Sequence, residues 1–585
     1  MNKSMHKLFL VNFILLICCA VGIAETQHVS LHHKLQEDMG SGAITRAEYL
    51  AYQLLAIQNS PELPQRYEPL NIEYERHATG LVAEAVSLLP TLPDNQQQLL
   101  KQALSRPSNL PLSIVSPSGR FRLHYTDSGY DAADEAFLLE SAKAYDDAYE
   151  LIVEELGYPV PPVDPVAGPE WDVYVSNLGN YGYSTPENAA PTERYPHGVT
   201  SFIQMDNDFN STYTKGLDGM RVTAAHEFFH TVQLGMRNFP STKLDSRWLY
   251  EATATWMEDV AYESVNDYLQ YLPHYFSTLH RPFYTFNGLH EYGLSIFFHM
   301  LEEKYGADIV RRLWEEFAIQ EQFEALENVL RSQGSSFAME LTDHMVWNYF
   351  TGMRADTTQF YPEGRAYPLV EPHANIYIEK TAGVADEAAL LGAKYINVQP
   401  DGFGTLTLTP DFPKPQEWMY AVVNQPLGRE AQVYTTSGSR NLVLPQVSPT
   451  NTIYLMPVCI TVPTSDATNV TEELEFLLTL GDVSNFEPKI QAVFPNPFRP
   501  PEHPQGLRID VRLTEKTQEM TLIVLKENGQ EVFREFMPFE SEQYGDLSVY
   551  WDGRSSAGDL VSSGVYLIYI QAGQEIKPAK VALIR

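Results

Sequence analysis

The chain has 585 residues, and 75 Asp and Glu against 40 Lys and Arg give it a formal net charge of -35 at pH 7. One hydrophobic core rarely fills so long a chain, so three or four domains are expected. The excess of negative charge argues against nucleic acid or an anionic membrane as a partner, because both bind basic surfaces.

Residues 1–24 have the pattern of a cleaved secretory signal. Lys3 and Lys7 precede an apolar run that ends at Cys19, and small residues follow. The run is too short for a typical membrane span, and no later stretch is long and apolar enough for one. We expect an exported protein, secreted or held at the cell surface, whose charge becomes -37 when two lysines are lost from the -35 of the whole chain. A lipoprotein anchored at Cys19 stays open, although the preceding Cys18 is not the small residue that such a site requires.

The mature chain keeps one cysteine, Cys459, so it cannot form an intramolecular disulfide. The setting of Cys459 in Leu-Met-Pro-Val-Cys-Ile-Thr-Val predicts a buried apolar residue and not a nucleophile. An exported protein without disulfides must rely on packing and on metals for its stability.

Residues 25–112 show helical periodicity at Ala47–Ile57 and again at Gly80–Leu89, with proline-bearing loops between them. The pattern predicts a small all-helical region ahead of the main domain. Two interpretations of this region stay open, a pro-segment and a docked accessory domain, because nothing in the sequence marks a cleavage site.

Residues 113–368 mix strand and helix patterns. Strands are predicted at Phe121–Tyr125, Trp171–Ser176 and Thr200–Asp206. Asp134–Leu156 predicts an amphipathic helix between the first two strands. After the third strand, Asp206-Asn-Asp208 fits an ordinary turn better than a calcium site.

The central motif of this domain is His226-Glu227-Phe-Phe-His230. At four-residue spacing both imidazoles lie on one face of a helix and can reach a single zinc ion. Glu227, one residue further round the helix, can take a proton from a water at the metal. Asp218 predicts the N-cap of this helix and Gly235 its end. Two histidines hydrogen-bonded in a helix without metal remain the alternative, because the bare motif also occurs by chance.

Zinc in a hydrolase takes three protein ligands and keeps a fourth position for water. About twenty residues after His230, Arg247–Asp259 predicts a buried helix in which a lone carboxylate, Glu251, would be costly. With its Trp-Leu-x-Glu context, this pattern resembles the gluzincins, the thermolysin-like and aminopeptidase-like clan of metallopeptidases. The resemblance implies His226, His230 and Glu251 as zinc ligands, with Glu227 as the general base.

More closely, the run from His226 to Asp259 resembles an uncharacterised family of secreted bacterial metallopeptidases. The resemblance extends to Ser116–Thr126, Trp171–Val175 and Tyr292–Phe297. Among these segments, only the zinc motif carries chemistry that follows from the residues themselves.

The resemblance also implies supporting residues around the metal. Related peptidases often have an acidic residue four positions after the third ligand, where it orients a histidine. Thr255 occupies that position here, so Glu258 or Asp259 is expected to take the role. The strand at Thr200–Asp206 is expected to border the cleft and to offer an open edge to an extended substrate.

The hydrolysis also needs a donor for the developing oxyanion. The candidates are Tyr292, His290, His274 and Tyr284. Tyr292 is favoured because Glu-Tyr-Gly at the start of a helix resembles the tyrosine-glycine found downstream of the zinc site in related peptidases. A tyrosine of the core is equally consistent with the residues alone.

The C-terminal part of the chain shows only β patterns. Residues 369–482 contain short alternating strands with turns and predict an all-β sandwich. Residues 486–585 contain Trp551-Asp-Gly and Ser563-Gly-Val-Tyr and resemble the FlgD-like immunoglobulin-type module at the C-terminus of many exported bacterial enzymes. The resemblance implies contact with the cell surface or with secretion machinery, while a stabilising appendage is the plainer interpretation.

The predicted fold is a multidomain α+β protein, with a zincin-like α+β metallopeptidase core after a helical N-terminal region and before two all-β, Ig-like sandwich domains. The predicted function is that of a secreted zinc-dependent metalloendopeptidase, which hydrolyses peptide or protein substrates by Glu-assisted attack of water at the zinc. A catalytically silent cell-surface adhesion or scaffold protein built on a zincin fold is the alternative. Hydrolysis of a non-peptide amide by the same residues also stays open.

Overall fold

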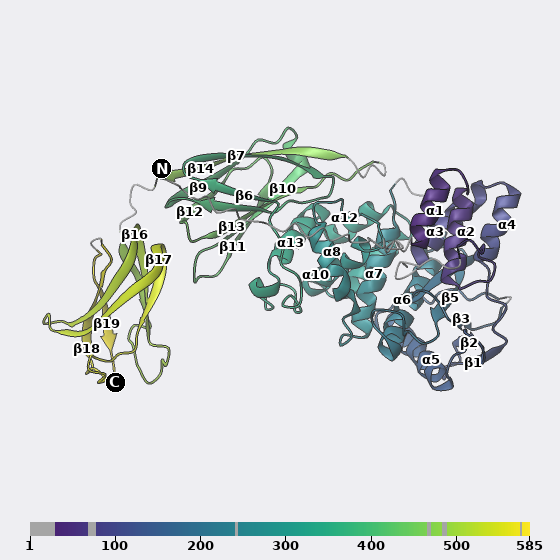
Figure 1. Ribbon diagram of the computed structural model, residues 1–585, viewed down its shortest axis with the longest axis horizontal. Helices are drawn as coiled ribbons and strands as arrows, with labels where there is room; N and C mark the ends of the chain where they lie inside the picture. Colours follow the sequence, from purple (N-terminus) through teal and green to yellow (C-terminus); the bar gives the residue numbers. More distant parts are fainter. Residues whose placement is uncertain are drawn as a thin grey trace, which may run out of the picture.

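The computed structural model describes residues 30–67, 78–165, 167–239, 244–464, 470–482, 488–573 and 576–585. The expected signal at residues 1–24 lies outside the described residues. Helices and a mixed sheet lie at one end of the molecule and a β module at the other, with further helices and a β-sandwich between them (Figure 1). The expectation of a mixed α and β protein, helical at its N-terminal end and all-β towards its C-terminus, is confirmed.

The N-terminal region is helical, as its periodicity predicts. It comprises α1 (Leu31–Gly40), α2 (Arg46–Ile57), α3 (Thr79–Leu88) and α4 (Asp94–Ala103). Helix α2 begins at a capping box, in which the Thr45 hydroxyl accepts from Glu48 N and the Glu48 carboxylate accepts from Thr45 N. The helices share an apolar core that includes Leu35, Leu50, Leu54, Val82 and Leu100.

A five-stranded sheet follows in the order β1-β2-β3-β5-β4. Its strands are β1 (Leu112–Val115), β2 (Phe121–Tyr125), β3 (Trp171–Ser176), β4 (Gly182–Ala189) and β5 (Val199–Asp206). Strands β2, β3 and β5 are parallel, while β1 and β4 are antiparallel edge strands. The three predicted strands are confirmed as β2, β3 and β5, and the two edge strands, β1 and β4, are additions that the sequence analysis did not predict.

The position of β5 corrects one expectation. Strand β5 pairs with β3 on one side and with β4 on the other, so it lies inside the sheet and has no open edge. The prediction that Thr200–Asp206 offers an edge to a substrate was therefore wrong. The edge strand next to it is β4.

Helices α5 (Glu135–Tyr149) and α6 (Gly216–Met236) pack together against the sheet, and α7 (Arg247–Ala261) packs against α6. Asp134, the first residue of the predicted helix, is the N-cap of α5, since its carboxylate accepts from Ala136 N and Phe137 N. A π-helical turn, Glu150–Glu155, continues α5.

The two predicted ends of α6 were wrong. The helix begins at Gly216, so Asp218 lies in its first turn and is not the N-cap. Gly235 lies inside the helix, which ends at Met236. A Cβ at Gly235 would come within 2.7 Å of Pro162 Cδ, so this glycine allows a close approach of the segment at Pro162 to α6 and does not stop the helix.

The remaining helices complete the central part of the molecule. They are the 3₁₀ turn Asp267–Tyr271, α8 (Leu272–Ser277), α9 (His290–Gly293), α10 (Ser295–Tyr305), α11 (Asp308–Phe317), α12 (Gln322–Ser332) and α13 (Phe337–Tyr349). Among the described residues, no helix is both long enough and apolar enough to cross a membrane.

A β-sandwich follows, with sheets ordered β11-β10-β13-β8-β6 and β12-β9-β14-β7. Its strands are β6 (Ala374–Ile378), β7 (Thr381–Ala389), β8 (Ile396–Pro400), β9 (Gly404–Pro410), β10 (Trp418–Gln425), β11 (Gln432–Ser437), β12 (Leu442–Val447), β13 (Thr452–Cys459) and β14 (Thr471–Asp482). Cys459 is buried in its core, as predicted.

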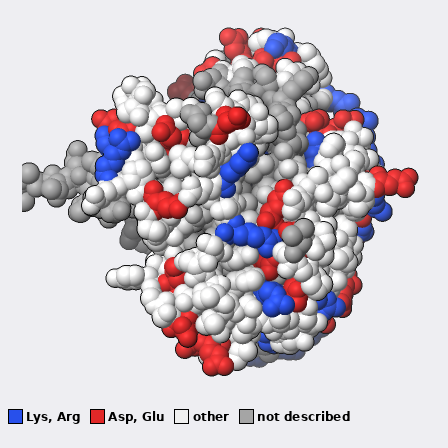
Figure 2. All heavy atoms as spheres, turned by 90° about the vertical axis from the view of Figure 1, so that its right-hand side faces the viewer, with Lys and Arg blue, Asp and Glu red and all other residues white. Residues whose placement is uncertain are grey.

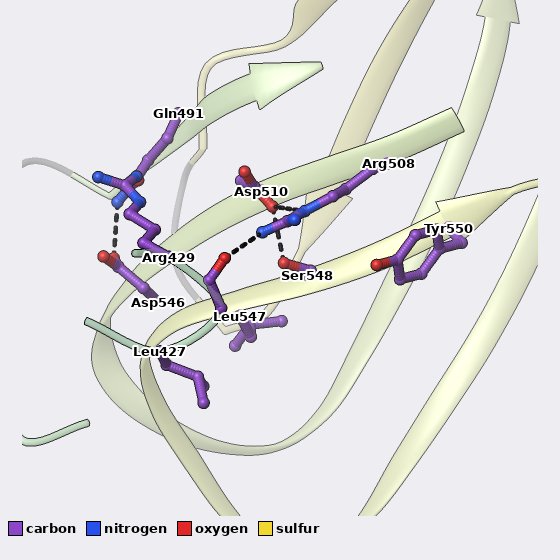
Figure 3. Close-up of a pocket in the computed structure, with 10 residues that line it drawn as sticks. Leu427, Arg429, Gln491, Arg508, Asp510, Asp546, Leu547, Ser548 and Tyr550 are labelled. Carbon is purple, nitrogen blue, oxygen red and sulfur yellow. Dashed lines mark hydrogen bonds and ion pairs between the residues drawn. The ribbon is translucent and has the colours of Figure 1, made fainter. Parts of the chain in front are cut away.

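The C-terminal module has a sheet ordered β15-β16-β18-β19, with β17 paired to β16. Its strands are β15 (Lys489–Phe494), β16 (Leu507–Lys526), β17 (Glu531–Trp551), β18 (Gly564–Gln571) and β19 (Ala579–Leu583). The module has a core of its own around Trp551 and Tyr566. Arg508 donates to Gly428 O of the sandwich at 3.2 Å, beside a pocket of about 280 Å³ between the two domains (Figure 3).

Candidate metal centre

Two helices bring three side chains together. His226 and His230 extend from α6, and Glu251 extends from α7. Glu251 Oε2 lies 3.3 Å from His226 Nε2 and 3.6 Å from His230 Nε2, and the three potential ligand atoms lie within 4.8 Å of one another. Two imidazole nitrogens and one carboxylate oxygen are a donor set that zinc takes in hydrolases.

The centre is closed to solvent. His226, Glu227 and His230 are 0% exposed and Glu251 is 1% exposed. Within the described chain, His230 Nε2 and Glu251 Oε2 make no hydrogen bond, which is costly for buried polar atoms. A cation between them would satisfy both atoms, so the residues fit a metal ion.

The other ring nitrogen of His226 is held by α7. His226 Nδ1 lies 2.6 Å from Glu258 Oε1, so the ring donates from Nδ1 and turns Nε2 towards Glu251. Glu258 therefore has the orienting contact that was expected of Glu258 or Asp259. Glu251 and Glu258 are seven residues apart on one helix face, so α7 contacts both nitrogens of the same imidazole.

The second imidazole is held from within α6. His230 Nδ1 lies 2.6 Å from Gln233 Oε1, which fixes the direction of Nε2. Gln233 is fixed in turn, because its amide nitrogen donates to Tyr250 O at 3.2 Å and to Thr253 Oγ1 at 3.0 Å. Both imidazoles are thus aimed before any metal binds, which lowers the cost of forming the site.

Glu227 faces the edge strand β4. Ser184 Oγ lies 2.8 Å from Glu227 Oε2 and 3.1 Å from Glu227 O. A Cβ at Gly182 would lie 3.4 Å from Glu227 Cγ, so β4 passes directly beside this side chain. Burial raises the pKa of Glu227, although His230 and His226 oppose the shift. A raised pKa suits a carboxylate that accepts a proton and returns it.

Charge at the centre follows from burial and close pairing. Burial lowers the pKa of His226, but the adjacent carboxylates of Glu251 and Glu258 outweigh burial and raise it to about 9. Burial raises the pKa of Glu251, but His230 and His226 outweigh it and lower this pKa to about 2. Because a metal ligand must be a neutral imidazole, a proton and a cation compete for the centre.

Two of the four oxyanion candidates lie on one short helix next to the centre. Tyr292 and His290 lie on α9, which packs against the α7 helix that carries Glu251. Tyr292 is buried, with its ring centroid 4.9 Å from that of Tyr271. The others have partners of their own: His290 Nδ1 lies 3.0 Å from Thr278 Oγ1, His274 Nε2 lies 3.4 Å from Asn287 Nδ2, and the Tyr284 ring contacts Phe323. Burial lowers the pKa of His290 to about 3.

Asp259 has surroundings different from those of Glu258. Asp259 Oδ2 lies 3.8 Å from His299 Nε2, and burial raises the pKa of Asp259 to about 8. The same burial lowers the pKa of His299 to about 3, so at neutral pH this pair is uncharged. The carboxylates that add to the shift of Asp259 are Glu363, Glu263, Glu258 and Glu302.

The acidic turn after β5 is structural. Asp206 accepts from Leu178 N at 2.8 Å and from Phe209 N at 2.7 Å. These hydrogen bonds link the segment after β3 to the turn after β5. Asp206 therefore fits the interpretation of an ordinary turn better than that of a calcium site.

Two residues of the centre were missed by sequence reasoning. Ser184 lies on an unpredicted strand, and no sequence signal links it to Glu227. Gln233 follows the motif by three residues, and its position on the helix face of His230 was a usable signal.

Comparison with known families gives two matches. Residues 214–350, which span α6 to α13 and contain the candidate metal centre, match a family of unknown function (DUF6055). Residues 503–575 match the FlgD Ig-like domain. The C-terminal module is an FlgD Ig-like domain. A comparison with curated proteins gives no match.

Solved structures show only distant likeness. PorZ, an essential bacterial surface component of the type-IX secretion system of Porphyromonas gingivalis, is 23% identical over 19% of this chain and 14% of its own, with a TM-score of 0.14. Latent PorU from the same organism is 15% identical over 36% of this chain and 19% of its own, with a TM-score of 0.15. The Yersinia pseudotuberculosis-derived mitogen is 11% identical over 19% of this chain and 93% of its own, with a TM-score of 0.14. Such TM-scores are too low to support an argument about fold or function.

Proposed function

We propose that the chain is a zinc-dependent metallopeptidase with a zincin-like core, in which His226, His230 and Glu251 hold the metal. The observation that carries this proposal is the convergence of three potential ligand atoms within 4.8 Å, with Glu227 next to one ligand on the same helix. When bound, zinc supplies a Lewis acid that polarises the scissile carbonyl and makes water a nucleophile near neutral pH.

The protein residues supply the rest of the chemistry. Glu227 accepts the proton of the attacking water and passes it to the leaving amine. Ser184 orients Glu227, while Glu258 and Gln233 orient the two imidazoles. Tyr292 is the residue we propose as oxyanion donor, because its helix packs against α7.

The substrate class follows from β4. This strand is the edge of the sheet and runs beside Glu227, so its outer main-chain groups can pair with an extended peptide. Such pairing depends on the backbone and not on one side-chain type, which suits an unfolded protein segment as substrate.

Glu227→Gln tests the proposal, since it keeps the size of the side chain but cannot take the proton. The variant should keep about one zinc per chain and lose at least about two orders of magnitude of hydrolysis. Elemental analysis gives the zinc content, and cleavage of an unfolded protein gives the rate. Glu263→Gln, at an exposed position just beyond α7, is the matched control.

The outcomes separate the peptidase from the alternative, a catalytically silent scaffold. A wild-type chain that binds zinc but cleaves no peptide or protein in any form would favour the scaffold. A chain that binds no zinc would contradict the metal centre itself.

We also propose that the protein is exported and that its FlgD Ig-like domain contacts the cell surface or secretion machinery. The signal pattern of residues 1–24 supports export. N-terminal sequencing of exported material should give a start near Glu25. An intact Met1, or a lipid on Cys19, would contradict the assignment.

A further inference from the structure

The residues of the metal centre are buried although a peptidase must admit a chain to its general base. Glu227 is 0% exposed. The edge strand β4 beside it packs against α3, one of the N-terminal helices. These helices lie next to the mixed sheet at one end of the molecule (Figure 1). We call the helices α1 to α4, within residues 30–104, the N-terminal cover.

The cover takes main-chain groups on the outer edge of β4. Ala78 N donates to Gly182 O at 3.3 Å, and Ser184 N donates to Thr79 Oγ1 at 3.3 Å. In this segment the main-chain groups of Tyr181 and Tyr183 point towards β5. The main-chain groups of Gly182 and Ser184 alternate with them and point to the outer side of the sheet. The groups taken are therefore those that an extended peptide would need.

One residue links the cover to the general base. The Ser184 backbone N–H is bound by Thr79 of the cover, and the Ser184 hydroxyl lies 2.8 Å from Glu227 Oε2. A chain paired at Ser184 thus lies one side chain away from the reacting carboxylate. The cover occupies the place where a substrate backbone would have to lie.

Apolar packing and hydrogen bonds hold the cover against β4 and the segment before it. Tyr183 of β4 and Leu178 of the connection between β3 and β4 belong to the apolar core of the cover. Gln58 donates to the Tyr183 hydroxyl at 2.8 Å, and Gly179 N donates to Ile57 O at 3.0 Å. These apolar groups and hydrogen bonds would become exposed to water if the cover left, so they stabilise its docked position on β4.

The cover also contacts the opposite wall, at the start of the Glu251 helix. Arg247 Nη1 donates to Gly80 O at 3.2 Å. A Cβ at Gly80 would come within 2.3 Å of Phe286 Cζ, so α3 lies tightly against this side of the centre. Helix α3 therefore bridges β4 and α7, the two elements that frame Glu227.

A further anchor lies in the connection from α4 to β1. Arg106 forms ion pairs with Asp172 of β3 and with Glu187 of β4.

On the surface of this end of the molecule, basic side chains lie among acidic ones and form no continuous basic stripe among the residues coloured (Figure 2). Ser108 and Asn109, just after the anchor, are exposed.

We propose that the N-terminal cover inhibits the metal centre by occupying the substrate edge of β4, and that a substrate can reach Glu227 only after the cover has left this edge. The inference rests on the proposed peptidase function. It also resolves the two interpretations of residues 25–112 in favour of an inhibitory segment. A closed state favoured tenfold or more would reduce the measured activity by about the same factor.

Two changes to the full chain test the inference. In the first, a recognition sequence for a specific protease is inserted between Ser108 and Asn109 and then cut, and the protein is assayed at nanomolar concentration so that the severed cover dissociates. In the second, Gly80→Val pushes α3 away from Phe286. Gly40→Val is the matched control, because a Cβ at Gly40 meets nothing within 4 Å.

Two quantities are measured on each form, namely kcat/KM for an unfolded protein and the rate at which a chelator removes zinc. The cut chain and Gly80→Val should show both increased at least about tenfold over the uncut chain and Gly40→Val. The chelation rate does not depend on turnover, so it reports opening of the centre directly.

Each outcome decides between the two proposals. If every form binds zinc and shows the same Glu227-dependent hydrolysis and the same chelation rate, inhibition by the cover is refuted and the peptidase stands. If no form binds zinc or none cleaves the substrate, the proposed function fails, and the inference fails with it. A Gly80→Val chain that does not fold leaves the decision to the cut chain.

Discussion

Replacement of Glu258 tests how the two helices share the metal centre. The contact between His226 Nδ1 and Glu258 Oε1 is 2.6 Å long, and both side chains are nearly inaccessible, at 0% and 2%. A buried hydrogen bond to a charged group contributes about 1.5–3 kcal/mol. Loss of such a partner weakens metal binding by roughly 10–100-fold, or about 1.4–2.8 kcal/mol. We expect Glu258→Gln to raise the zinc Kd by about tenfold and Glu258→Ala by about a hundredfold.

Competition with a chromophoric zinc chelator gives the Kd of each variant. Glu251→Ala should leave no measurable high-affinity site, because it removes a ligand and not its support. Glu263→Gln should bind zinc like the wild type. If Glu258→Ala abolished zinc binding while Glu251→Ala kept it, the roles of the two carboxylates would be the reverse of those proposed.

Three further predictions follow from the fold and its electrostatics. Ser184→Ala removes the hydroxyl at Glu227 and should lower kcat about tenfold with zinc content unchanged, whereas an equal loss of zinc would indicate a purely structural role. Because Asp259 has a folded pKa of about 8, above its unfolded value, the wild type should lose stability as pH rises from about 4 to 8. Asp259→Asn should lack this loss, so its melting-temperature advantage should grow with pH, and a constant difference would contradict the neutral carboxyl. Deletion of residues 486–585 should leave zinc content and cleavage of a short peptide unchanged, because this module has its own core, and a large fall in turnover would place it in the site.

The parts of the centre that were predictable depend on local spacing. His226, Glu227 and His230 lie on one helix, so four-residue periodicity alone fixes their shared face. The helix of Glu251 was predictable from its aromatic and small residues, and α7 begins at Arg247 as expected. The packing of α7 against α6 is a contact between separate segments of the chain, so residue spacing could not predict it. The resemblance to the gluzincins provided that expectation.

Strand β4 was missed because its residues are poor strand formers. Its sequence, Gly-Tyr-Ser-Thr-Pro-Glu-Asn-Ala, has no clear alternation and contains a proline. An edge strand tolerates Pro186, since no neighbour needs its missing N–H. The docking of the cover on this strand was equally hidden, because it joins residues about a hundred positions apart, such as Thr79 and Ser184.

The unusual composition of β4 has a consequence for solubility. A sheet edge with free main-chain groups pairs readily with another copy of the same protein, and such pairing leads to aggregation. In β4 only the first half of the edge, around Gly182 and Ser184, offers such groups without interruption. Pro186 then removes a donor and Glu187 adds a charge, which are two devices that keep edges from sticking to each other. A molecule whose cover has left is therefore protected against β-aggregation by the very residues that made this strand hard to recognise.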